Sequence, residues 1–240
     1  MSTFGEDENI LKLNNPELDR KMGGLPLPSF TLVEGANDSG KTIIIQQFTY
    51  GALTAGKRVL YITTEDTAKG LVNNMERLNW NITDYYLMGK FRITTMNTMN
   101  MDWTKEVSKY YLIALSNFIK QRGDNFDIVF IDSLTHLVSH ATESDVMEFF
   151  STCRYIVDTM GLTFVMTMHP YAINSELLVR LRTFCDGHLV LEIKSFRDRT
   201  ALTINVAKLK GATKTVSETI SFEVSPAYGI KILPFSSTRG

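Results

Sequence analysis

Cysteine is scarce in this sequence, long apolar runs are missing, and the net charge is close to zero. Only Cys153 and Cys185 occur among the 240 residues, each in an apolar, helix-like stretch. A disulfide framework or a zinc site is therefore not expected, and a reducing cytoplasm is the expected compartment. No apolar run approaches the ~20 residues that a membrane-spanning helix needs, so any membrane association would be peripheral. The formal net charge of −1 gives no global reason to expect nucleic acid as the main partner.

The sequence does contain enough apolar material for one substantial core, since 44% of its residues are apolar and 10% are aromatic. We expect one domain over residues 1–240. Within it, residues 1–15 are predicted to form a loosely held N-terminal arm, because their acidic and polar composition shows no clear period.

The most informative stretch runs from Gly35 to Thr42 and matches the phosphate-binding pattern G-x-x-x-x-G-K-[ST]. It lies between a strand predicted at residues 29–34 and a helix predicted from Thr42 to about Thr54, which is the setting that a P-loop needs. The phosphates of ATP would rest on the amides of the loop at the helix N-terminus. Lys41 would reach the β- and γ-phosphates, and the Thr42 hydroxyl would ligate Mg²⁺. The other loop residues expected to bind the nucleotide are Gly35, Ala36, Asn37, Asp38, Ser39 and Gly40.

Two further apolar strands end in carboxylates. Residues 126–132 end in Asp132, the form expected of a Walker B strand whose Asp holds Mg²⁺. Residues 58–66 end in Glu65 and Asp66. Because ligands bind at the carboxyl ends of strands in an α/β sheet, these acids should converge on the P-loop. Taken singly, Asp132 also fits a helix N-cap, and Glu65 also fits a solvated loop acid.

The order of the predicted elements indicates an α/β fold. Helices are expected at residues 67–78, 103–122 and 142–160, and an inner strand at 162–169, which implies a mainly parallel sheet flanked by helices. From His188 onward, strand-like runs at 188–194, 200–208, 219–224 and 228–233 are joined by short turns, so the sheet should finish with an antiparallel extension. Residues 94–101, rich in Met and Asn, fit either a surface loop or an adaptable contact surface.

This arrangement resembles the RecA-like ATPases, especially their KaiC-like branch, and among single-domain members the accessory ATPases of the archaeal flagellum, or archaellum. The likeness rests on six stretches: residues 18–28, 35–42, 61–66, 130–134, 208–211 and 222–224. It implies a RecA-like P-loop fold that binds ATP with Mg²⁺.

The resemblance also implies roles for matched positions. Lys41 and Asp132 would act in catalysis beside Glu65, the family's glutamate that orients the attacking water, and Asp66 stands where relatives carry a second acid. Lys208 and Lys210 fall where KaiC-like rings place basic residues that reach the γ-phosphate of a neighbouring subunit; otherwise they are solvated strand-end charges. That position implies a ring, usually of six subunits. Thr167 or His169 would sense the γ-phosphate, and His169 equally fits a cap at the strand end.

Two departures from the family pattern bear on turnover. Asp38 replaces a loop glycine and brings a carboxylate near the phosphates, although Asp tolerates a left-handed backbone. Lys210 stands where an arginine is frequent, and an ammonium cannot clamp a phosphoryl group in two places. Nucleotide binding is therefore expected to survive better than hydrolysis, and whether ATP is hydrolysed at a useful rate stays open.

The resemblance implies an ATP-binding component of the archaellum motor that acts as a nucleotide-gated regulatory or assembly ATPase. Its partners would be the motor ATPase and the membrane platform protein, at the cytoplasmic face of the membrane. One alternative is a RecA/RadA-type DNA-dependent ATPase, which needs basic loops; residues 170–175 carry no Lys or Arg, and the next basic residue is Arg180. The other is a KaiC-like signalling ATPase, although such proteins usually carry two ATPase domains.

Overall fold

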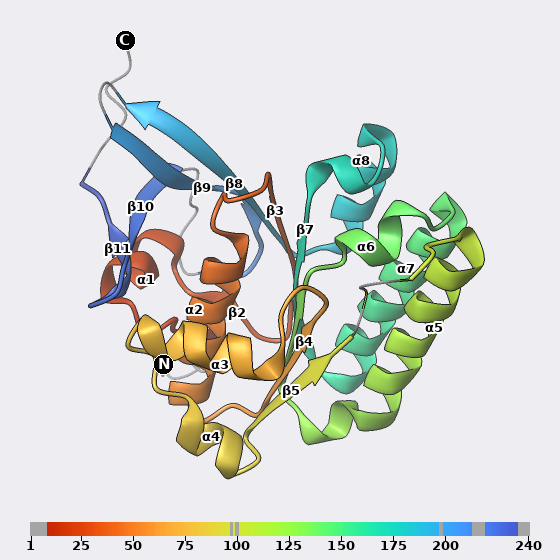
Figure 1. The fold of residues 1–240 in the computed structure, drawn as a ribbon, viewed down its shortest axis with the longest axis horizontal. Coiled ribbons are helices and arrows are strands. Elements are labelled where there is room, and N and C mark those ends of the chain that lie inside the picture. Colours follow the sequence, from red (N-terminus) through yellow and green to blue (C-terminus); the bar gives the residue numbers. More distant parts are fainter. Residues whose placement is uncertain (1–8, 97, 99–100, 197–198, 213–218, 235–240) are drawn as a thin grey trace, which may run out of the picture.

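The computed structural model describes residues 9–96, 98, 101–196, 199–212 and 219–234 (Figure 1). In this part of the chain the strands form a nine-stranded sheet of order β11-β10-β9-β8-β3-β7-β6-β4-β5. Its parallel strands are β3 (Phe30–Gly35), β4 (Val59–Thr63), β5 (Phe91–Thr95), β6 (Ile128–Asp132), β7 (Thr163–Met168) and β8 (Gly187–Phe196). The strands β9 (Arg199–Leu209), β10 (Thr219–Ser225) and β11 (Gly229–Ile232) continue the sheet antiparallel. The predicted fold class, including the antiparallel C-terminal extension, is confirmed.

Helices cover both faces of the sheet, as Figure 1 shows. The helices are α1 (Pro16–Met22), α2 (Lys41–Thr54), α3 (Ala68–Arg77), α4 (Thr83–Leu87), α5 (Lys105–Arg122), α6 (Thr135–Ser139), α7 (Glu143–Met160) and α8 (Ser175–Phe184), with 3₁₀ turns at Gly123–Asn125 and Pro170–Ala172. One core cluster packs α2 and α3 on one face, and a second packs α5, α7 and α8 on the other. Among the described residues, no helix has the length and apolar character required to cross a membrane.

The central strands are buried on both faces, which explains their nearly continuous apolar sequences. Successive side chains of a strand point to opposite faces. Val59 and Tyr61 of β4 therefore join the cluster under α2 and α3, while Leu60 and Ile62 join the cluster under α5 and α7. This burial fixes the register of β4 and hence the place of the acids that follow it.

Helix ends follow the sequence signals. Thr142 caps α7, since its Oγ1 accepts a hydrogen bond of 3.2 Å from the Asp145 amide. Helix α1 ends at Gly23, whose φ of 80° needs a glycine. The short helices α4 and α6, together with α8, were not placed from the sequence. Both cysteines are buried, Cys153 in α7 and Cys185 at the end of α8.

The prediction of a loosely held arm is wrong for residues 9–15, and residues 1–8 lie outside the described residues. Ile10 pairs with Pro26 in a small sheet of β1 (Ile10–Leu11) and β2 (Leu25–Pro26). Leu13 is fully buried, and its carbonyl accepts a hydrogen bond of 2.7 Å from Gln47 Nε2 of α2. The apolar residues between the polar ones are thus enough to hold this segment on the core. In the segment 94–101, residues 97, 99 and 100 also lie outside the described residues.

Candidate functional site

The loop between β3 and α2 has the backbone that its residue types permit. Asp38 has a φ of 59°, as expected for an Asp in a left-handed position, and Gly40 has a φ of 91°. A Cβ at Gly35 would lie 2.9 Å from the Leu191 carbonyl oxygen and would collide with Ser39 Oγ, so a glycine is required there. Within the part of the chain that the structure describes, no side chain caps the start of α2. Its first amides are therefore available to an anion at the helix N-terminus.

Asp132 is held rigidly at the end of β6. Only 4% of the residue is exposed, and its carboxylate accepts hydrogen bonds from Thr167 Oγ1 at 2.6 Å and Tyr61 OH at 2.9 Å. The Thr42 hydroxyl lies close enough to help lower the pKa of this carboxylate. Burial raises the pKa of Asp132 and the nearby Glu65 charge adds to this, although the hydrogen bonds oppose both effects. Asp132 and Thr42 thus lie close together, and their role as metal ligands stays a prediction.

The two acids after β4 have different surroundings. Glu65 is exposed, and its Oε1 accepts a hydrogen bond of 2.5 Å from Ser133 Oγ. The Asp66 carboxylate instead accepts hydrogen bonds from the Thr67 amide at 2.7 Å and from Asn74 Nδ2 at 3.1 Å. Asp66 therefore fastens the start of α3, and Glu65 is the acid that faces the P-loop.

Lys41 lies among these carboxylates. Its Nζ donates a hydrogen bond of 2.7 Å to the Ala36 carbonyl, and the residue is only 7% exposed. Burial lowers the pKa of Lys41, against the opposing effect of the negative charges on Glu65, Asp132 and Asp38. The ammonium is thus placed in the P-loop beside the acids, as expected from the sequence.

A cavity of about 500 Å³ opens between these groups. Its polar side carries P-loop residues, Glu65 and His169, and its apolar side is built by Ile43, Leu202 and Val224. Leu202 and Val224 come from β9 and β10 of the antiparallel extension. The sequence carries no local signal for them, because only the sheet order brings these strands beside the P-loop.

His169, at the end of β7, lines the cavity and is also bonded to its neighbours. Its Nδ1 lies 2.8 Å from Thr135 Oγ1, and its ring stacks on Tyr171 with centroids 5.0 Å apart. Burial lowers the pKa of His169, and the positive charge of Lys41 acts in the same direction. A neutral imidazole is therefore favoured near pH 7. Thr135 was missed in the sequence, since nothing local marks it as a partner of His169.

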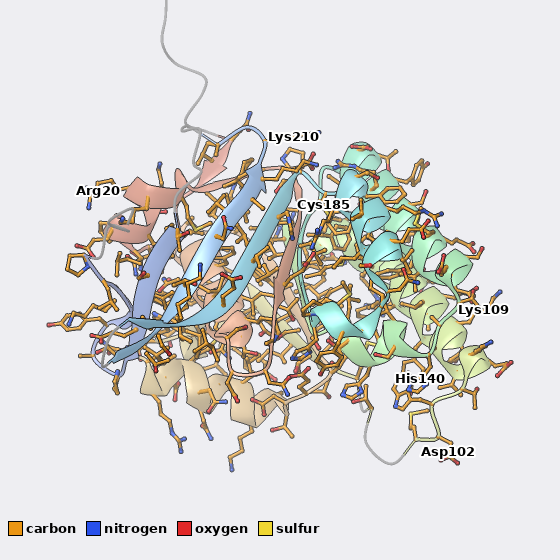
Figure 2. The ribbon with its side chains drawn as sticks, turned by 90° about the horizontal axis from the view of Figure 1, so that it is seen from above. Arg20, Asp102, Lys109, His140, Cys185 and Lys210 are labelled. Carbon is orange, nitrogen blue, oxygen red and sulfur yellow. The ribbon has the colours of Figure 1, made fainter. Side chains whose placement is uncertain are left out.

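Lys208 and Lys210 lie away from this crevice, towards the end of the sheet at which the parallel strands begin. Lys208 pairs with His188, which pairs with Leu32, three residues before Gly35. The Lys208 ammonium was expected to reach a neighbouring subunit or to lie in solvent. It instead donates hydrogen bonds to the Arg182 carbonyl at 3.3 Å and to the Cys185 carbonyl. The free carbonyls at the end of α8 attract this cation. Lys210 is exposed at the rim of the molecule, where β9 ends (Figure 2).

A buried ion cluster, missed in the sequence, lies beneath the P-loop. Glu34, directly before Gly35, is 2% exposed and accepts hydrogen bonds from Arg182 Nε at 3.0 Å and Nη2 at 2.7 Å. His188 Nε2 lies 2.9 Å from the same carboxylate. Burial alone would raise the pKa of Glu34, but the contacts with His188 and Arg182 outweigh it and hold this pKa below its ordinary value. The cluster ties α8 to the strand that carries the P-loop.

The segment between β7 and α8 offers no basic surface to a nucleic acid. The first basic residues after it are Arg180 and Arg182, and these pair with Glu143 and Glu34. This arrangement does not favour the DNA-dependent alternative, which needs free cations along a strand path.

Known proteins resemble the chain over nearly its whole length. A family model described as "ATPase: KaiC" matches residues 12–237. The archaeal flagellar ATP-binding protein FlaH from Sulfolobus acidocaldarius is 33% identical over 230 residues, which cover 96% of this chain and 99% of that protein. This match confirms the resemblance drawn from the motifs.

Two crystal structures share the fold. The flagellar accessory protein FlaH from Methanocaldococcus jannaschii has a TM-score of 0.83 at 22% identity, covering 94% of this chain and 98% of that one. A KaiC-like protein from Pyrococcus horikoshii has a TM-score of 0.73 at 23% identity, covering 94% and 99%. Together they confirm the RecA-like architecture.

Proposed function

The chain belongs to the KaiC family of ATPases, with FlaH-type archaeal flagellar ATP-binding proteins among its relatives, and we propose that it is an ATP-binding component of the archaeal flagellum. In this proposal it acts as a nucleotide-gated regulatory or assembly ATPase, and its intrinsic hydrolysis is slow or absent. Occupancy of the crevice by ATP, rather than rapid turnover, would set its shape and its partner binding.

The observation that carries the proposal is the position of Asp132. Its buried carboxylate lies near Thr42 at the start of α2, in the same site as Lys41 and Glu65. A buried ionisable group whose pKa is shifted by burial and by a specific neighbouring charge is a candidate functional group. Four residues on three elements, α2 and the ends of β4 and β6, thus supply the groups that a bound nucleoside triphosphate requires.

The chemistry of these groups fits ATP with Mg²⁺. Thr42 and Asp132 offer the oxygen ligands that Mg²⁺ prefers, and they would hold it. When bound, Mg²⁺ neutralises charge on the phosphates. Lys41 and the amides of residues 35–42 would bind the phosphate oxygens. Ile43, Leu202 and Val224 form the apolar wall against which the base would lie.

Hydrolysis would depend on Glu65, which would orient the attacking water from its place beside Ser133. Asp38 lies exposed in the P-loop, where its carboxylate would repel the phosphates. Lys210 offers a point charge where a planar guanidinium would clamp the γ-phosphate. Both features slow the chemical step more than they weaken nucleotide binding.

Assembly would complete the site. Since Lys208 and Lys210 lie away from the crevice of their own chain, they would act on ATP only across an interface between subunits, in a ring of six. Lys210 is exposed and available for this contact, whereas Lys208 would have to leave the end of α8. The ring would dock on the motor ATPase and the membrane platform protein at the cytoplasmic face of the membrane.

A gene replacement in the organism that encodes the chain tests the proposal. With Lys41→Ala, cells should accumulate the protein at normal levels but assemble few or no flagella. The matched control is Lys69→Ala, which removes an exposed lysine of α3 outside the crevice and should leave flagellation unchanged. Normal flagella on Lys41→Ala cells would show that nucleotide occupancy is not required, and the proposal would fail.

A further inference from the structure

The nine-stranded sheet has a free edge at β5. Among the described strands, β5 pairs only with β4, and Figure 1 shows it at the border of the sheet beside α4. The outer edge of such a strand presents unpaired N–H and C=O groups, which invite another strand unless they are covered. A cavity of about 740 Å³ runs along this edge between α4, β5 and the end of α5, and we name it the edge groove.

Part of the edge groove is apolar. Ile93 of β5 and Phe118 of α5 line it, together with Tyr86 and Leu87 of α4. Helix α4 and the residue after it expose three consecutive large side chains, with Tyr86, Leu87 and Met88 exposed to 47%, 75% and 64%. Isolated exposed apolar residues are common, but a contiguous group beside a cavity marks an interaction site.

The charged side chains that line the edge groove are both arginines, Arg92 of β5 and Arg122 of α5. Neither has a carboxylate partner in the part of the chain that the structure describes, whereas Arg58, Arg154, Arg180 and Arg182 each pair with an Asp or Glu. A guanidinium binds a carboxylate through parallel hydrogen bonds. The charge of the edge groove thus complements an acidic ligand.

We propose that the edge groove binds an extended acidic segment of a partner protein, which adds to the sheet as a further strand beside β5. Main-chain hydrogen bonds to β5 would provide affinity, as in other proteins that recognise peptides by strand addition. The apolar side chains of the segment, which share one face, would lie beside Ile93, and its carboxylates on the other face would pair with Arg92 and Arg122. The site is separate from the nucleotide crevice, so the proposal does not rest on ATP binding.

Fluorescence anisotropy with the full chain tests the proposal, using as probe a fluorescein-labelled peptide of alternating glutamate and valine. The probe should bind saturably, and the double variant Arg92→Glu, Arg122→Glu should weaken binding by about tenfold or more. The control Lys69→Glu, Lys105→Glu makes the same change in net charge on α3 and at the other end of α5, and it should bind like the wild type. Equal affinity of both double variants would overturn the proposal, as would a wild type that does not bind.

Two further measurements separate strand addition from other occupants. A probe with proline in place of the central valine lacks a main-chain donor and should bind more weakly, and hydrogen exchange should show that the intact probe protects amides of β5. Binding that leaves β5 unprotected would overturn the proposal. So would binding seen only after deletion of residues 1–8, which would identify the chain's own N-terminal segment as the occupant.

Discussion

Ser133 donates a hydrogen bond of 2.5 Å from its Oγ to Oε1 of Glu65. Ser133 directly follows Asp132, so this bond joins the end of β6 to the acid that follows β4. The two acids nevertheless differ: Asp132 is buried and accepts several hydrogen bonds, while Glu65 is exposed. This contrast suits a buried metal ligand and a solvent-accessible group that orients water.

The first prediction concerns hydrolysis. Glu65→Gln should remove the slow ATP hydrolysis of the purified protein, because a positioned carboxylate of this kind contributes ~10²–10⁴-fold to rate. Ser133→Ala should reduce the rate less, since it releases Glu65 without removing it. Asp66→Asn, the control, should hydrolyse ATP like the wild type because Asp66 is bound to α3. The rate of phosphate release from ATP measures these effects. Several turnovers per second in the wild type, or an unchanged rate in Glu65→Gln, would contradict the account.

The second prediction separates stability from function at Asp132. Its folded pKa lies above its ordinary value of 3.8, so the ionised carboxylate destabilises the fold at neutral pH and this cost disappears on acidification below 3.8. Asp132→Asn should therefore have a higher Tm than the wild type at neutral pH, because the substitution removes this buried charge. The same variant should lose the additional stabilisation by Mg-ATP, which is ~2.7 kcal/mol for the wild type at one hundred times Kd. Thermal scans at neutral pH check both effects, and a variant still stabilised by Mg-ATP would contradict the role of Asp132.

The third prediction concerns the ion cluster beneath the P-loop. Glu34→Gln should reduce the free energy of unfolding by about 1–3 kcal/mol at neutral pH, less than the ~3–5 kcal/mol typical of a broken buried pair, because the Arg182 side chain is 34% exposed. Since the folded pKa of Glu34 is lowered, its contribution is fully present above its ordinary value of 4.5 and is lost as the pH falls through the folded pKa.

Urea unfolding of wild type and Glu34→Gln at neutral and acidic pH measures this difference. The control is Glu192→Gln, which removes an exposed partner of Lys194 and should cost at most about 1 kcal/mol. A Glu34→Gln cost that stays constant below pH 4.5 would show that the ion cluster is not its source.

The fourth prediction concerns assembly. Lys210→Ala should weaken ATP-dependent ring formation without changing the Tm of the monomer, because Lys210 is exposed and would act on a neighbour's nucleotide. Lys208→Ala should lower the Tm, since Lys208 holds the end of α8. Light scattering with ATP and with ADP should show more oligomer with ATP in the wild type and in the control Lys231→Ala. If the oligomer content were the same with ATP and with ADP in every variant, the proposal that a neighbouring subunit completes the ATP site would be contradicted.

The P-loop, the acidic strand ends and most of the succession of strands and helices along the chain were predictable from the sequence, because their signals are local. The pattern from Gly35 to Thr42 identifies its own loop, and the apolar strand before Asp132 predicts its own burial. Leu202, Val224 and the pair of Glu34 with Arg182 were not predictable, since each depends on which distant strand or helix lies beside β3. Lys208 shows the same limit: its position in β9 was predicted, but its contact with the end of α8 follows from tertiary packing. The burial of Leu13 was not predicted, because the polar residues around it leave no recognisable apolar period in residues 1–15.

The central claim is that the crevice at Lys41 and Asp132 binds Mg-ATP, and calorimetric titration of ATP into wild type and Lys41→Ala tests it most directly. The wild type should bind ATP in the presence of Mg²⁺ and more weakly after chelation. Lys41→Ala should show no measurable binding, because the buried ammonium is the cation placed to meet the β- and γ-phosphates, while Lys69→Ala should bind like the wild type. Unchanged affinity in Lys41→Ala would contradict the account.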